Sequence, residues 1–193
     1  MTMLRWKFDV EKLISAIGYL STAGVRELSK LKLAKLLFFA DKEHLIRHGR
    51  PILGDEYFAL DYGPVPSKSL DLLDGAAADE AFSDREHFDQ YLEITPGKYP
   101  EFRARTEPDL DVLSESEVEV LEQIGCTYGA MSPSQLVKIT HDDPSWKKAD
   151  RDRSPYGRER MPYEDFFSEN PKMLELARAE QENRDFERSF FRV

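Results

Sequence analysis

The sequence predicts a predominantly α-helical α+β domain with one central buried helix and a small antiparallel β-sheet. The first observation is a helical segment, residues 29–48, whose first half is apolar on almost every side. The second is the presence of short segments with strand character, 55–62 and 91–105, next to turn residues. Third, 193 residues can form one domain with a substantial core but are few for two. The stretch 150–160 is too short to act as a linker between domains, so we expect residues 1–193 to form a single domain.

Two helices are expected at the start of the chain. Asp9 is placed to act as the N-cap of the first helix, and Gly24 to end it. The apolar residues between them recur at helical spacing: Val10, Leu13, Ile14, Ile17 and Leu20. The second helix is expected from about Ser29 to His48, with Gly49 as a left-handed residue after its end. Because this helix is apolar nearly all round, it should be the central one.

The strands are expected in the middle of the chain. Residues 55–62 alternate, with Phe58, Leu60 and Tyr62 on one face and Tyr57, Ala59 and Asp61 on the other. Segments 91–94 and 99–105 flank Thr95-Pro96-Gly97-Lys98, which is a plausible turn and predicts an antiparallel pair. The alanine-rich stretch 75–84 is compatible with a short helix or a loop.

The second half of the chain is expected to be helical. Ser114 with Glu117, and Ser132 with Gln135, have the spacing of capping boxes. Asp143 before Pro144 predicts the start of a short helix. After an Arg/Asp/Pro/Gly-containing loop, two further helices are expected at 161–167 and at about 171–189.

Composition and charge restrict the classes of partner. The formal net charge is −10 and no clustered basic face is visible, which argues against nucleic acid as a direct partner. A negative surface favours encounter with basic proteins, although the same charge also serves solubility. Cys126 is the only cysteine, so no intrachain disulfide can form. We expect no signal peptide, no membrane span and a cytoplasmic location.

One helix face carries a constellation that suggests metal chemistry. His44 and His48 have the i, i+4 spacing of a metalloprotease helix, and Asp41 lies on the same face. However, Leu45 stands where the catalytic glutamate would be, and Arg47 would oppose a bound cation. A metal-dependent hydrolase using His44 and His48 is therefore only an alternative, and we expect no cofactor and no enzymatic activity.

Lys35 is unusual because it lies in the apolar half of the second helix. A buried, unpaired ammonium is costly. Either its stem runs along the helix so that the charge reaches solvent, or the charge forms an ion pair with a carboxylate from a neighbouring element. The surrounding leucines favour the ion pair.

The segment Tyr62-Gly63-Pro64-Val65-Pro66 has a structural explanation at each position. Gly63 permits backbone angles that a side chain would forbid, and Pro64 and Pro66 fix two φ angles. Ser67 is placed to cap the helix that follows. We interpret the segment as a tight strand-to-helix connection that can also serve as a rigid ridge, with Tyr62, Pro64 and Val65 as candidate partner contacts.

A second polar group surrounds Trp146. His141 with two aspartates suggests an acid–base pair, but Asp143 is better explained as an N-cap and Trp146 as a core or groove anchor. We expect His141 to have a hydrogen-bonded structural role. No Gly-x-Ser-x-Gly elbow supports Ser–His–Asp catalysis.

Two further surfaces are candidates for partner contact. The first is the acidic run from Glu107 to Glu122, from which we select Glu115, Glu117 and Glu119 as candidate docking residues. The second is the apolar C-terminal stretch with Phe190 and Phe191, which either folds back on the core or contacts a partner.

The sequence resembles the Panacea domain, the SocA-like antitoxin family of bacteria and their phages. The resemblance is strongest over residues 33–73 and weaker over 136–166. It is carried by Leu33-Ala34-Lys35-Leu36-Leu37-Phe38-Phe39-Ala40-Asp41, Gly49-Arg50-Pro51-Ile52, Tyr62-Gly63-Pro64-Val65-Pro66, Leu136 to Trp146 and Met161 to Phe166. Phe38 departs mildly from the family pattern, which often has tyrosine there.

This resemblance implies an antitoxin that neutralises a protein toxin by direct binding, with the toxin encoded in an adjacent gene. It leaves open the alternative of a proteolytic adaptor that delivers the bound toxin to an ATP-dependent protease. The residues alone would indicate only a binding-type domain.

Overall fold

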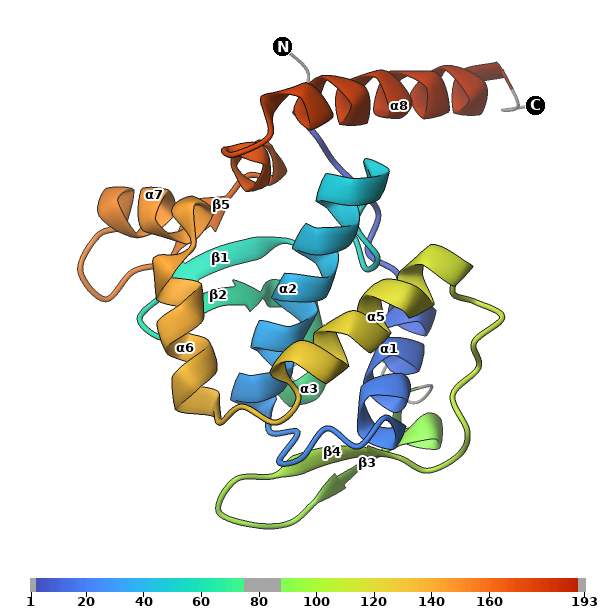
Figure 1. The fold of residues 1–193 in the computed structure, drawn as a ribbon, viewed down its shortest axis with the longest axis vertical. Helices are drawn as coiled ribbons and strands as arrows, with labels where there is room; N and C mark the ends of the chain where they lie inside the picture. Colours follow the sequence, from blue (N-terminus) through green and yellow to red (C-terminus); the bar gives the residue numbers. More distant parts are fainter. Residues whose placement is uncertain (1–2, 75–87, 191–193) are drawn as a thin grey trace.

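The computed structural model describes residues 3–74 and 88–190 (Figure 1). Most of these residues lie in helices, with two small antiparallel sheets, so the predicted α+β class is confirmed. The expectation for 75–84 and the placement of Phe191 lie outside the described residues.

Helix α2 (Lys30–His48) is the central element of the domain, as predicted. It runs through the middle of the molecule and packs against α5 (Glu115–Tyr128), α6 (Pro133–Asp142) and β2 (Gly63–Pro66) (Figure 1). Its buried side chains include charged as well as apolar ones: Lys32, Leu33, Ala34, Lys35, Leu36, Leu37, Phe38, Phe39, Ala40, Asp41, His44 and Leu45. The unusual feature of this core is therefore the charge that it contains.

The predicted helix ends agree with the structure where local chemistry decides them. Helix α1 (Val10–Thr22) begins after Asp9, whose side chain accepts a hydrogen bond from the Lys12 N–H. Gly49 has φ +71° at the C-terminal end of α2. Both predicted capping boxes are present, at the starts of α5 and α6. The side chain of Asp143 caps α7 (Pro144–Asp152).

A three-stranded sheet has the order β2–β1–β5, where β1 is Tyr57–Leu60 and β5 is Glu159–Met161. Both pairings are antiparallel, and Tyr57 lies opposite Pro66 on one side and Met161 on the other. The prolines of β2 are tolerated because this strand is at the sheet edge. Helix α3 (Ser67–Asp74) follows β2 directly.

A separate two-stranded sheet consists of β3 (Leu92–Thr95) and β4 (Glu101–Ala104), as predicted. Strand β4 packs against α1, and the Phe102 N–H donates to the Leu28 carbonyl oxygen at 3.0 Å. This hairpin lies at the end of the domain opposite α8 (Pro171–Phe190), which packs on α2 and on the 3₁₀ helix η2 (Tyr163–Phe167) (Figure 1).

Two sequence-based interpretations need correction. Residues 63–66, interpreted as a turn, are a strand, and the turn is formed by the two residues before them, Asp61 and Tyr62. Residues 159–161, assigned to a loop and a helix start, form β5, so the predicted helix is reduced to η2. Strand β2 pairs with β1 across the tight turn between them, whereas β5 pairs with β1 across about a hundred residues, which no local pattern reports.

No helix in the described part of the chain is long and apolar enough to cross a membrane.

Candidate partner-binding surface

The hairpin of β1 and β2 is attached to the central helix through Lys35. Its side chain is fully buried, and its Nζ donates a hydrogen bond to the Pro64 carbonyl oxygen at 2.8 Å. Burial lowers the pKa of Lys35 to about 7. No carboxylate of the described residues pairs with this ammonium, so both interpretations from the sequence, solvent exposure and an ion pair, were wrong.

Gly63 is required where the hairpin lies against this lysine. Its φ is +95°, and a Cβ atom there would lie 2.6 Å from the Thr140 Oγ1 and 3.1 Å from the Lys35 Nζ. The close approach of β2 to α2 and α6 therefore depends on the missing side chain. Pro64 and Pro66 are buried and Val65 is half-buried, which leaves Tyr62 as the exposed residue of the predicted ridge.

Trp146 supports the other strand of the hairpin. Its indole Nε1 donates to the Leu60 carbonyl oxygen at 3.3 Å, and its ring stacks on His141 with centroids 4.1 Å apart. The Nε2 of His141 is buried and has no hydrogen-bond partner among the described residues, so this stacking replaces the hydrogen-bonded role that we expected. Asp143, which caps α7, also forms an ion pair with Lys42 of α2.

Two turns at the end of the hairpin are joined by Arg153. Its guanidinium contacts the Asp61 carboxylate at 2.7 Å and the Gly157 carbonyl oxygen at 3.1 Å. Tyr62 and Tyr156, one on each turn, are 69% and 98% exposed. Sequence reasoning had selected Tyr62 but missed Tyr156, which has a left-handed φ of +61°. We call Asp61, Tyr62 and the turn 154–157 the hairpin tip.

Asp41 fixes the chain between α2 and the sheet. Its carboxylate accepts hydrogen bonds from the N–H groups of Ile52 and Leu53 at 2.9 and 2.7 Å, and from the Tyr57 hydroxyl at 3.0 Å. Burial raises the pKa of Asp41 to about 7, although these donors act in the opposite direction. Pro51, which precedes this segment, is buried.

Asp55 caps α3 from outside the helix. It accepts hydrogen bonds from the N–H groups of Lys68 and Ser69 at 2.9 and 2.8 Å. The predicted cap, Ser67, is instead the first residue of the helix. Burial raises the pKa of Asp55, and the hydrogen bonds that it accepts oppose this shift.

Arg50 and Glu117 join three elements. The buried Glu117 carboxylate forms ion pairs with Lys12 of α1, whose Nζ lies 2.6 Å from its Oε1, and with Arg50. The Arg50 guanidinium also donates a hydrogen bond to the Ser114 Oγ at 3.1 Å. Burial acts to raise the pKa of Glu117, but the donors from Lys12, Ser114 and Arg50 outweigh it and lower the pKa. Glu117 is therefore inaccessible to a partner, unlike the exposed Glu115 and Glu119.

The histidines on α2 differ in environment. His44 is buried, with its Nδ1 2.7 Å from the Arg50 carbonyl oxygen and its Nε2 3.1 Å from the Ser116 Oγ. Burial lowers the pKa of His44 to about 4, which favours the neutral ring. His48 is exposed and lies against the His44 ring. Among the described residues, no group of three or more His, Cys, Asp or Glu side chains could hold a metal ion.

The C-terminal candidates are only partly described. Phe190 is the last residue of α8. Phe186, one turn earlier, is 63% exposed.

The described residues thus form a helical α+β domain in which buried polar side chains fix an edge hairpin with an exposed tyrosine. The family described as antitoxin SocA-like, Panacea domain, matches residues 33–147, more than half of the chain. The chain therefore belongs to this family, as the sequence resemblance implied. The matched range includes Lys35, Asp41, Arg50, Gly63 and Trp146, whose contacts are described above. No curated protein and no solved structure matches.

Proposed function

We propose that this protein is an antitoxin that neutralises a protein toxin by binding to it directly, without chemistry of its own. The family to which the chain belongs supports an antitoxin role. The observation that carries direct binding is the hairpin tip, where Tyr62 is exposed although the strands beside it are held by Lys35 and Trp146.

A fixed, exposed tyrosine suits protein recognition. Tyrosine is enriched among the residues that dominate binding energy at interfaces, because it provides a large contact area at a small cost in side-chain entropy. Arg153 holds the two turns of the tip together, so less conformational freedom is lost when a partner binds. Tyr156 adds a second aromatic side chain to the same surface.

Co-expression tests this function. We expect the adjacent gene, expressed alone, to arrest growth of the host, and this chain to restore growth through a stoichiometric complex that co-purifies. A harmless neighbour would contradict the proposal. So would a toxic neighbour that forms no complex with this chain and is not restrained by it.

Substitutions at exposed tyrosines test the surface separately. Tyr62→Ala should abolish or strongly weaken rescue while changing the free energy of unfolding by less than about 0.5 kcal/mol. Tyr99→Ala is the matched control, because Tyr99 is 71% exposed on the turn between β3 and β4. Equal rescue by the two variants would contradict a role for the hairpin tip.

Toxin half-life, measured with and without this chain, distinguishes neutralisation by binding from delivery to a protease.

A further inference from the structure

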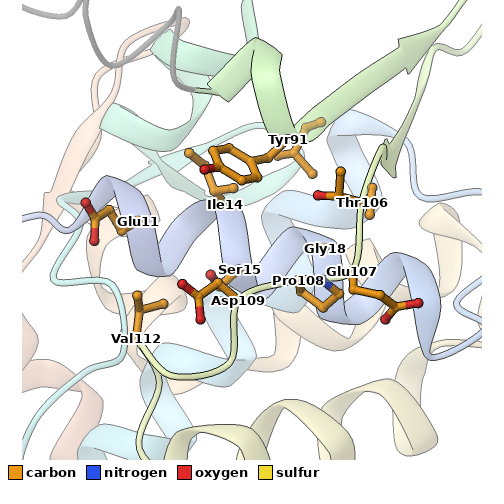
Figure 2. A pocket seen from close by; sticks show the side chains of 12 residues that line it. Glu11, Ile14, Ser15, Gly18, Tyr91, Thr106, Glu107, Pro108, Asp109 and Val112 are labelled. Atoms are coloured by element: carbon orange, nitrogen blue, oxygen red, sulfur yellow. The ribbon is translucent and has the colours of Figure 1, made fainter.

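A small pocket opens between α1 and the segment that connects β4 to α5 (Figure 2). Its volume is about 180 Å³. Helix α1 forms one wall with Ile14, Ser15 and Gly18, and Tyr91 and Leu92 close the pocket from the side of β3. The connecting segment, residues 106–112, forms the opposite wall.

The deep part of the pocket is apolar except for one hydroxyl group. Ile14 and Leu92 are 6% and 2% exposed, and Gly18 brings Pro108 close to the helix. Ser15 is 4% exposed and lines the pocket, but its hydroxyl has no hydrogen-bond partner among the described residues. Because the Ser15 hydroxyl lines the pocket and has no partner in the described part of the chain, it can donate a hydrogen bond to, or accept one from, a group that enters the pocket.

The rim of the pocket carries three carboxylates: Glu11 on α1, and Glu107 and Asp109 on the connecting segment (Figure 2). None of the three forms an ion pair within the described residues. One Asp109 oxygen accepts the Asp111 N–H at 3.0 Å, which leaves its other oxygen available. The cations nearest to these carboxylates in the sequence have other partners: Lys12 pairs with Glu117, and Arg105 donates to the Leu92 carbonyl oxygen and lies 3.8 Å from Glu93.

These features together select the chemistry of the occupant. An acidic rim favours a cation, and an apolar wall accommodates the methylene stem of a long side chain. The volume is below the roughly 300 Å³ at which pockets for drug-sized ligands begin. Arginine fits better than lysine, because its planar guanidinium can donate to the rim carboxylates and the Ser15 hydroxyl at once.

We propose that this pocket receives an arginine side chain of the toxin. The inference rests on the proposed function for the identity of the partner, and on the pocket itself for the chemistry. It assigns Glu11 and Asp109 to the guanidinium, Ser15 to a hydrogen bond with it, and Ile14 and Leu92 to its methylene stem.

Binding of a small probe tests the pocket without the toxin. In an NMR titration, N-acetylargininamide should shift the backbone amide signals of Ser15, Gly18 and Val112. The uncharged N-acetylnorleucinamide should not. The double variant Glu11→Gln/Asp109→Asn should weaken probe binding by about tenfold, since charge-assisted hydrogen bonds are lost. Glu182→Gln removes the same kind of charge from an exposed position on α8 and should leave probe binding unchanged.

Three results would overturn the pocket assignment: no shifts at the pocket residues, equal binding of the two probes, or equal binding by the double variant and the wild type. In co-expression, the double variant should also weaken the toxin complex relative to Glu182→Gln. If the probe binds but the neighbouring gene product is harmless, the antitoxin proposal fails and the cation-binding pocket stands. If rescue is normal and the probe does not bind, the pocket fails and the antitoxin proposal stands.

Discussion

The Nζ of Lys35 lies 2.8 Å from the carbonyl oxygen of Pro64, and this hydrogen bond joins the central helix to the edge strand of the sheet. Its position explains why a lysine is compatible with an apolar helix. The strand lies at a sheet edge, so its outward-facing carbonyl groups need donors from outside the sheet. Lys35 supplies one such donor, in its charged or its neutral form.

The first prediction concerns the pH dependence of stability that Lys35 causes. Its pKa is about 7 in the folded state, against the ordinary lysine value of 10.5 in the unfolded chain. Between these values the unfolded chain binds more protons, so stability rises with pH. From pH 7 to pH 9, the free energy of unfolding of the wild type should rise by about 2 kcal/mol relative to that of Lys35→Met. Urea unfolding of both proteins at the two pH values measures this, and parallel changes would contradict it.

Asp41 should produce a dependence of opposite sign at lower pH. Its folded pKa is about 7 against an ordinary aspartate value of 3.8, so its contribution is fully present below the lower value and is lost as pH rises through the higher one. From pH 5 to pH 7, the free energy of unfolding of the wild type, measured with urea, should therefore fall by about 2 kcal/mol relative to that of Asp41→Asn.

Asparagine is a suitable replacement at position 41. The Ile52 and Leu53 N–H groups both donate to the same oxygen, Oδ1, which an asparagine retains. Asp41→Leu is the control for loss of this acceptor, and it should be destabilised at every pH because two buried N–H groups lose their partner. Identical pH profiles for the wild type and Asp41→Asn would mean that Asp41 is ionised throughout the range.

Gly63 and Gly24 form a matched pair for separating backbone strain from crowding. Both have a left-handed φ, +95° and +82°, but a Cβ atom at Gly24 would meet nothing within 4 Å. Gly24→Ala should therefore cost only the backbone term, about 1–2 kcal/mol. Gly63→Ala should cost about 1–3 kcal/mol more, because its Cβ would overlap the Thr140 Oγ1.

Thermal or urea unfolding of the two glycine variants measures the difference. A double-mutant cycle with Thr140→Ala should then recover part of the additional loss at Gly63, because the overlapping atom is removed. Equal destabilisation of Gly24→Ala and Gly63→Ala would contradict the close packing of β2 against α6.

Local chemistry explains which features of this fold could be predicted from the sequence. The caps at Asp9, Ser114, Ser132 and Asp143 depend on groups within four residues, and all four appear in the structure. The central position of α2 could also be predicted, because a helix whose first half is apolar on almost every side is normally buried.

The features that were missed depend on contacts distant in sequence. Asp55 accepts a hydrogen bond at the start of α3 from the N–H of Lys68, which lies 13 residues later in the sequence. Lys12 donates to the Glu117 carboxylate across 105 residues. The spacing of acidic residues around Glu117 matches a solvated helix face equally well, so the burial of this one carboxylate was not visible. Tyr156 lacked a local signal too, because its role depends on Arg153 joining its turn to Asp61.

The last prediction separates the structural carboxylate of α5 from its exposed neighbours. Glu117→Gln retains an oxygen that can complete the capping box, but it leaves Lys12 and Arg50 without their counter-charge. Removing one partner from a fully buried pair costs about 3–5 kcal/mol. Because the two cations are partly exposed, we expect about 2–3 kcal/mol here, measured by urea unfolding at pH 7. Glu119→Gln should change stability by less than about 0.5 kcal/mol.

The pH dependence provides a second measurement for the same carboxylate. The folded pKa of Glu117 is lowered, so its stabilisation is present above the unfolded pKa and is lost as pH falls through the folded pKa. The difference in the free energy of unfolding between the wild type and Glu117→Gln should therefore shrink in acid, below the ordinary glutamate pKa of 4.5.

Glu117→Gln should impair rescue only to the extent that it lowers the amount of folded protein. The exposed pair Glu115→Lys/Glu119→Lys should leave folding intact, and any loss of rescue in that variant would assign this face of α5 to the toxin. A Glu117→Gln protein as stable as the wild type would contradict the ion-pair network.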